Sequence, residues 1–189
     1  MKKEEDKDPC TYGKFLELFP LCTKEKQEEL LERLRKQPCP QSICGKHVPD
    51  SLNMLTYGQL DDMQTAASSQ QPIEETCKVL LEVDSKLLLN EDVNDVFGFS
   101  NFVTKEINRI NKIFSSIKPS YSQEERAAGI ESLNFGAFGV LDWYAQRMHI
   151  ANQNEVRNIS WLRIFQCMKN DNEKNEFERR LYQIYSKKK

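Results

Sequence analysis

A three-residue pattern, a helix-capping residue followed by an aromatic residue and glycine, occurs three times in this chain of 189 residues. The copies are Thr11-Tyr12-Gly13, Thr56-Tyr57-Gly58 and Asn134-Phe135-Gly136. Thr or Asn at an N-cap accepts a hydrogen bond from a backbone N–H that has no partner inside the helix. After the second copy, Gln59 can return a hydrogen bond to the cap backbone, as in a capping box. The pattern therefore predicts three helices that begin in the same way.

Apolar side chains elsewhere recur at spacings of three and four residues, which is the period of a helix. The clearest run predicts a helix over 100–117, with Phe99, Phe102, Val103, Ile107, Ile110, Ile113, Phe114 and Ile117 at this spacing. Further helices are expected over 12–19, 24–36, 57–69, 73–89, 123–132, 135–149 and about 172–186, with shorter pieces after Asn152 and Ser160. No β-strand is expected, and residues 90–98 are expected to be irregular. The sequence thus predicts an all-α fold, an irregular bundle of about seven to nine helices.

A segment rich in proline marks the expected domain boundary. Residues 37–52 hold three of the seven prolines and show no helical period, which is typical of a loop or linker. We therefore expect residues 1–50 to form an N-terminal helical arm with a Cys- and Pro-rich loop. Residues 51–189 are expected to form a helical domain. Its most compact part is expected over 99–189, which holds both tryptophans and should fold alone.

One acidic residue interrupts an apolar helix face. Asp84 falls in the middle of the face expected for the helix over 73–89. A carboxylate is costly to bury without a partner. Either the helix breaks near Asp84, or the carboxylate is paired with a cation or caps a helix.

Composition and charge exclude several classes of protein. The chain has 39% hydrophobic and 30% charged residues, as globular proteins do, and a net charge of −2. Residues 1–37 have net charge 0, residues 38–100 net −7 and residues 101–189 net +5. This spread lacks the concentrated basic patch of a nucleic-acid binder. The chain has no apolar run of 18 residues and starts with the charged segment MKKEEDKDP, so we expect no membrane partner and a cytoplasmic location.

The six cysteines offer one pattern that resembles a metal site. Cys39, Cys44 and His47 lie close in sequence, and Cys22 or Cys10 could complete a set of four ligands. Zinc sites usually use tighter pairs such as CxxC, so this spacing favours free cysteines in a loop, and no metal or cofactor is expected. Cys77 and Cys167 lie within apolar helical patterns and are expected in the core.

The sequence contains no recognisable catalytic motif. Candidate Cys–His pairs are Cys167 with His149 and Cys44 with His47, and neither has a local signature of a nucleophile. P-loop, GxGxxG, HExxH and GxSxG motifs are absent from the sequence. The chain is therefore expected not to be an enzyme.

The most apolar helix supplies the candidate protein-binding residues. Over 135–149, the expected core stripe consists of Ala137, Phe138, Leu141, Tyr144, Ala145 and Met148. Trp143 lies outside this stripe, on the side of Gly139 and Arg147. One interpretation is a helix buried on two sides, because large aromatic residues usually mark a core. The other is a docking surface formed by Trp143, Arg147 and Gly139, because Trp and Arg are enriched among interface anchors.

Several segments together resemble a known family. They are Glu125–Ile130, Asn134–Gly136, Asp142–Tyr144, Trp161–Arg163 and Leu55–Leu60. Their layout over residues 52–185 resembles that of small all-helical proteins of tailed bacteriophages and prophages that are similar to tail assembly chaperones. The resemblance implies a long helical tape-measure-like partner and the cytoplasm of a bacterial host. It brings no catalytic residues.

We therefore expect a non-enzymatic helical binding protein that holds an amphipathic helical partner by burying the partner's apolar face. A tail assembly chaperone is the specific form that the resemblance implies. One alternative is a structural component of a phage particle, or virion. Another is a small metal-dependent regulator or enzyme that uses the Cys39–His47 loop. Self-association of the chain is an open alternative to a different partner.

Overall fold

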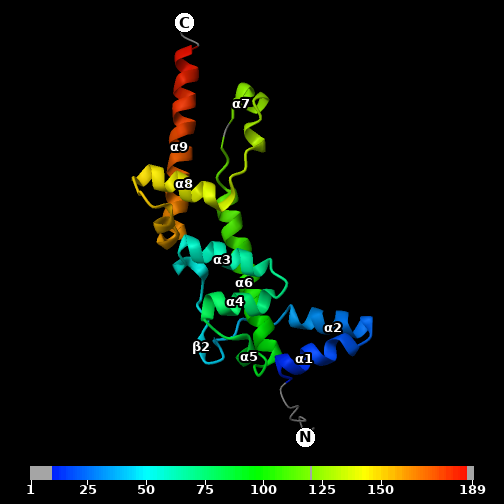
Figure 1. Ribbon diagram of the computed structural model, residues 1–189. Helices are drawn as coiled ribbons and strands as arrows, with labels where there is room; N and C mark the ends of the chain where they lie inside the picture. The colour runs from blue at the N-terminus through cyan, green and yellow to red at the C-terminus, as the bar shows by residue number, and fades with distance from the viewer. Residues whose placement is uncertain (1–9, 120, 187–189) are drawn as a thin grey trace. The chain divides into compact units, whose positions relative to one another are not determined.

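The computed structural model describes residues 10–119 and 121–186, and over these residues the predicted all-α fold is confirmed (Figure 1). The N-terminal elements are α1 (Tyr12–Leu18), η1 (Phe19–Leu21), α2 (Lys24–Leu34), β1 (Ser42–Ile43), β2 (Lys46–His47) and η2 (Leu52–Met54). The central elements are α3 (Tyr57–Ala67), α4 (Pro72–Leu81), α5 (Ser85–Leu88) and α6 (Val93–Ser115). The C-terminal elements are α7 (Gln123–Ala127), η3 (Ile130–Ser132), α8 (Gly136–Met148), η4 (Gln153–Asn158) and α9 (Trp161–Ser186).

The chain divides into two compact units, and each unit combines segments that are distant in sequence. The first contains the described part of Met1–Leu52 together with Asp62–Asn108. The second contains Asn53–Asp61 and the described part of Arg109–Lys189. This grouping differs from a boundary after residue 50, because long-range contacts and not chain order define a compact unit.

The first unit has its core along the first half of α6. The rings of Tyr12 and Phe15 lie 6.4 and 5.3 Å from the ring of Phe97. The Tyr12 hydroxyl donates a 2.8 Å hydrogen bond to Glu74. Burial and this contact with Glu74 raise the pKa of Tyr12 well above its usual value. The N-terminal helix α1 is therefore part of this core.

Residues 93–98 are helical, although we expected 90–98 to be irregular. Asp92 accepts a 2.7 Å hydrogen bond from the backbone N–H of Asn94, which supports a helix that begins at Val93. Gly98 lies inside this helix where the segment around Pro38 passes closely. A Cβ at Gly98 would lie only 2.0 Å from the Pro38 carbonyl oxygen. Glycine is therefore required here by close packing of two backbones.

The segment over 37–52 was expected to be a loop, and the structure corrects this with a short β-hairpin. Ser42 pairs with His47 and Ile43 with Lys46, in antiparallel register. The turn residues Cys44 and Gly45 have φ values of 48° and 73°, as a two-residue hairpin turn requires. Two residues per strand are too few for an alternating pattern, so periodicity could not reveal them.

The acidic residue in the apolar pattern of 73–89 marks a break between two helices. Helix α4 ends at Leu81, and Glu82 adopts a left-handed conformation with φ 54°. Asp84 is the N-cap of α5 and accepts a 2.8 Å hydrogen bond from the backbone N–H of Lys86. The helix therefore breaks near Asp84, and Asp84 also acts as a cap, so both alternatives hold here.

The second unit has its core around the start of α9. Trp161 and Ile164 are fully buried, and the ring of Phe114 lies 5.8 Å from Trp161 and 5.6 Å from Phe165. Helix α9 continues from Trp161 to Ser186 without interruption. The two helices expected after Ser160 and over about 172–186 are therefore one helix.

All three aromatic-glycine patterns lie at helix starts, with Thr11, Thr56 and Asn134 at the N-cap or one residue before it, as predicted, but the third copy is capped differently. Thr11 accepts from the backbone N–H of Lys14 at 3.3 Å, and Thr56 forms the capping box with Gln59. At the third copy the N-cap of α8 is Phe135, and Asn134 accepts instead from the N–H of Gly136 at 2.9 Å.

Candidate functional site

The apolar stripe predicted on α8 is buried only in its middle. Leu141, Tyr144 and Ala145 are buried, as expected. Phe138 is 62% exposed and Met148 is 36% exposed, so their placement in the core was wrong. Helical spacing fixes which side chains share a face, but a neighbouring segment must cover that face to bury them.

The three predicted binding residues of α8 lie four residues apart along one side of the helix. The Arg147 guanidinium binds both carboxylate oxygens of Asp171 on α9, at 3.0 to 3.2 Å. This hydrogen bonding raises the pKa of Arg147. Trp143 is half-buried, with its ring 6.0 Å from that of Tyr144, and a Cβ at Gly139 would meet Phe135. Arg147 thus has an intramolecular partner, and a binding role for the three residues stays a prediction.

The structure gives different contact partners to Cys39, Cys44 and His47, the residues of the metal-like pattern. The Cys39 thiol lies 3.5 Å from the carbonyl oxygen of Pro40, and His47 Nδ1 lies 3.1 Å from that of Gln41. The Cys44 backbone N–H donates to the Glu91 carboxylate. Burial, followed by the contact with Glu91, raises the pKa of the Cys44 thiol to about 11. Among the described residues, no group of three or more His, Cys, Asp or Glu side chains is placed to hold a metal ion.

All six cysteines lie in the described part of the chain, and all six are free thiols. Cys77 is buried, as predicted from its helical pattern, whereas Cys167 is partly exposed. Burial raises the pKa of the Cys77 thiol to about 12, with smaller effects from Cys44 and Glu74. A thiol with such a pKa is protonated at neutral pH and is a poor nucleophile.

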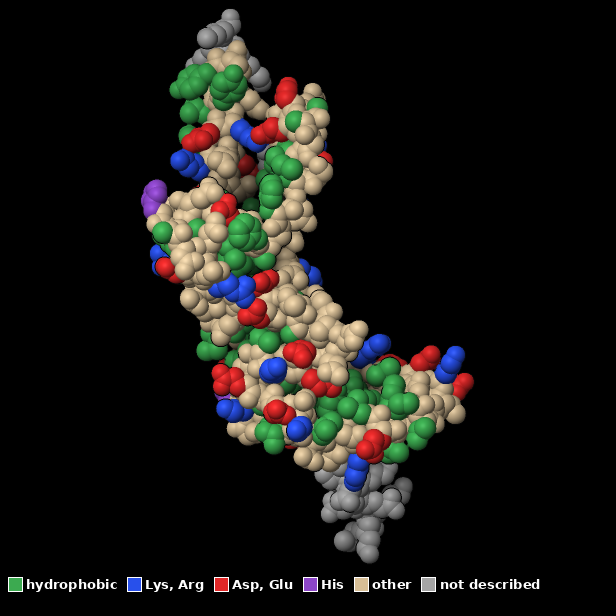
Figure 2. Space-filling view, in the orientation of Figure 1, with side chains coloured by type: hydrophobic (Ala, Val, Ile, Leu, Met, Phe, Trp, Pro, Cys, Tyr) green, Lys and Arg blue, Asp and Glu red, His purple; other side chains and the backbone are tan. Residues whose placement is uncertain are grey.

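The C-terminal half of α9 carries an uncovered apolar stripe, which we take as the candidate site. It consists of Phe177, Leu181, Ile184 and Tyr185, and we call it the α9 stripe. These side chains are 56%, 36%, 54% and 61% exposed, and their spacing places them on one face of the helix. Figure 2 shows apolar side chains gathered along this part of α9, on the side turned away from α7. Helical spacing in the sequence defines this face, whereas only the structure shows that it is exposed.

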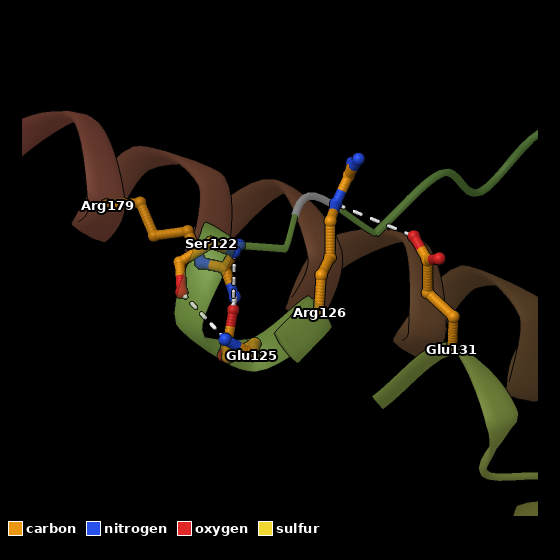
Figure 3. A network of polar contacts seen from close by, with 5 residues as sticks. All are labelled: Ser122, Glu125, Arg126, Glu131 and Arg179. Atoms are coloured by element: carbon orange, nitrogen blue, oxygen red, sulfur yellow. Dashed lines mark hydrogen bonds and ion pairs between the residues drawn. The ribbon is translucent and has the colours of Figure 1, made fainter. Parts of the chain in front are cut away.

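The opposite side of α9 holds the neighbouring segment that contains α7. Arg179 donates to both oxygens of Glu125, at 3.1 and 2.9 Å (Figure 3). Glu125 also completes the predicted capping box with Ser122 at the start of α7. At about 100° per residue, Arg179 points roughly 160° away from Leu181. The contact that fixes α7 against α9 therefore leaves the α9 stripe uncovered.

Two exposed ion pairs lie along α9. Lys174 and Glu178 form an ion pair of 3.8 Å, as do Lys169 and Glu173. Exposed pairs of this kind contribute little to stability. The α9 stripe itself consists of large apolar side chains, so we expect attraction at it to be mainly apolar.

Comparison with known protein families, with curated proteins and with solved structures finds no match to this chain. Over residues 10–119 and 121–186, no helix combines the length and apolar character needed to cross a membrane. Any function of the chain must therefore be argued from its own residues.

Proposed function

We propose that this chain is a non-enzymatic binding protein that packs an amphipathic helix of a partner protein against the α9 stripe. The observation that carries the proposal is the exposure of four large apolar side chains on one face of α9. Soluble proteins rarely expose contiguous apolar surface without a binding role. Apolar residues at this helical spacing are typical anchors for a partner helix.

The size of the stripe indicates reversible binding. Complete burial of a large apolar side chain stabilises by about 1.5–3 kcal/mol, so four half-exposed ones contribute roughly 4 kcal/mol. A partner helix that buries a similar apolar face contributes a comparable amount. Association costs at least about 4 kcal/mol in lost freedom of motion, which leaves a weak to moderate affinity. Such an affinity suits a protein that holds its partner for a limited time.

The cysteine chemistry supports binding over catalysis. The thiols of Cys44 and Cys77 have raised pKa values and are protonated at neutral pH. The side chains of Cys39 and His47 engage separate backbone carbonyls. These residues therefore lack the arrangement of a nucleophile beside a base that catalysis by cysteine needs.

The resemblance to tail assembly chaperones supplies a class of partner, a long helical tape-measure-like protein. In this proposal the α9 stripe covers apolar helical segments of that partner until it assembles. The alternative, a structural component of the particle, predicts that the chain is retained. Quantifying the chain in purified particles distinguishes the two roles.

A labelled amphipathic helical peptide tests the binding surface directly. Its binding to the full chain is measured by fluorescence anisotropy. We expect Leu181→Glu and Ile184→Glu each to weaken binding by roughly tenfold or more, since each removes an apolar anchor. Gln183→Glu adds the same charge on the opposite side of α9 and serves as the matched control. Equal affinity for the wild type and both stripe variants would refute the assignment.

A further inference from the structure

A positively charged side chain without an internal partner borders the α9 stripe. Arg180 follows Phe177 by three residues and precedes Ile184 by four, so on a helix its side chain lies beside both. Arg180 is exposed, and within residues 10–119 and 121–186 it forms no hydrogen bond or ion pair. Its guanidinium is therefore available to a molecule that covers the stripe.

The other charged side chains over residues 173–186 already have contacts within the chain. Most of them take part in ion pairs, namely Lys169–Glu173, Lys174–Glu178 and Glu125–Arg179. Glu176, one turn before Arg180, instead accepts a hydrogen bond from the Asn172 side chain at 3.4 Å. In this described half of α9, Arg180 is thus the charged residue that is left for an external partner.

The sequence adds further positive charge at this end of the chain. Residues 173–189 carry six basic and three acidic side chains, and the last three residues are all lysine. The C-terminal end of a helix carries only about half a negative elementary charge, which does not outweigh this excess. Because like charges repel across an interface, this end of the chain disfavours a basic partner and favours an acidic one.

We propose that the α9 stripe takes an amphipathic helix with one acidic edge, and that Arg180 is the residue that selects this helix. The inference rests on the proposed function, since it concerns the same stripe and adds the charge of its partner. The partner helix packs its apolar face on Phe177, Leu181 and Ile184. An Asp or Glu beside that apolar face pairs with Arg180. Apolar contact supplies most of the affinity, and the charge pair supplies specificity.

The charges on the two edges of the stripe also set the direction of the bound helix. Residues two apart on a helix point to nearly opposite sides, so Glu178 borders the stripe on the edge away from Arg180. A partner helix with one acidic edge meets Arg180 in one direction and Glu178 in the reverse direction. The reverse direction places like charges side by side, so the first direction is favoured.

Three labelled helical peptides with the same apolar face test the proposal. They differ only along one polar edge, which is made of Glu, Gln or Lys, three residues of similar helix propensity. Their binding to the full chain is measured by fluorescence anisotropy at low and at high salt. At low salt we expect the Glu peptide to bind about fivefold more tightly than the Lys peptide, with the Gln peptide between them. The difference should shrink at high salt, because salt screens exposed charges.

Two variants of the full chain assign the preference to Arg180. Arg180→Glu should remove or reverse it. Arg163→Glu makes the same change in charge at an exposed position about 26 Å away along α9 and is the matched control, which should keep the wild-type preference. Equal binding of the Glu and Lys peptides to the wild type, or a preference that persists in Arg180→Glu, would overturn the inference and leave the proposed function standing. Failure of all three peptides to bind would overturn the proposed function, and the inference with it.

Discussion

Replacing Gly98 by alanine tests how closely the segment around Pro38 packs on α6. The added Cβ would lie 2.0 Å from the Pro38 carbonyl oxygen and 3.3 Å from Cδ of Pro40. The nearest of these atoms belongs to backbone and cannot rotate away. One of the two segments must therefore move by about 1 Å or more for normal contact to be restored.

The expected change in the free energy of unfolding combines one stabilising and two destabilising contributions. Alanine is favoured over glycine inside a helix by about 1 kcal/mol, which would stabilise the variant. Overpacking of a rigid contact costs about 1–3 kcal/mol. The same movement strains the hydrogen bonds from the Asn101 side chain to the carbonyls of Leu34 at 2.9 Å and Gln37 at 3.2 Å, which contribute about 1 kcal/mol each. We expect a net loss of about 2–3 kcal/mol in the free energy of unfolding.

Urea denaturation followed by circular dichroism at 222 nm measures this loss. Lys105→Ala, an exposed change in the same helix, is the control and should alter the free energy of unfolding by less than about 0.5 kcal/mol. Asn101→Ala should lose part of the same stability without introducing a clash. A Gly98→Ala variant as stable as the wild type, or more stable, would mean that helix propensity decides and that the close approach is absent.

Three further changes test the core and α8. In the folded state the pKa of the Cys77 thiol is raised to about 12 from an ordinary value of 9. The contribution of the protonated thiol to the free energy of unfolding is therefore complete below pH 9 and is lost as the pH rises through about 12. Urea melts at about pH 8 and about pH 10.5 should therefore show a larger loss of stability in the wild type than in Cys77→Ala. The Glu106 carboxylate accepts a 2.9 Å hydrogen bond from the buried Leu52 N–H, so Glu106→Ala should lower the free energy of unfolding by about 2 kcal/mol. Glu106→Gln retains an acceptor and should lower it by less. Trp143→Ala should lower the free energy of unfolding by about 2 kcal/mol, and the buried control Leu141→Ala should lower it by about 3 kcal/mol. A Trp143→Ala variant that is unchanged in both thermal stability and partner binding would refute both roles considered for this residue.

Some helix boundaries were predictable because they depend on neighbouring residues alone. The caps at Thr11 and Thr56 and the box of Ser122 with Glu125 involve residues three apart in the chain. The break at Asp84 was signalled by an acidic residue on an apolar face. By contrast, the hairpin at Cys44 and Gly45 has strands too short to leave a periodic signal. Local hydrogen bonding can be judged from sequence, whereas a two-residue strand depends on what packs beside it.

The sequence alone determined the all-α class and the apolar face of α9, because helical spacing and capping are properties of adjacent turns. It also showed the repeat of aromatic residue and glycine. Only the tertiary structure decided that Tyr12 and Tyr57 are buried while Phe135 is exposed. It likewise decided that the α9 stripe is uncovered, since Arg179 holds α7 on the other side of the helix. The physical reason is that a side chain becomes buried only when another segment packs against it. The sequence of one segment specifies its own apolar face but not the segment that covers that face.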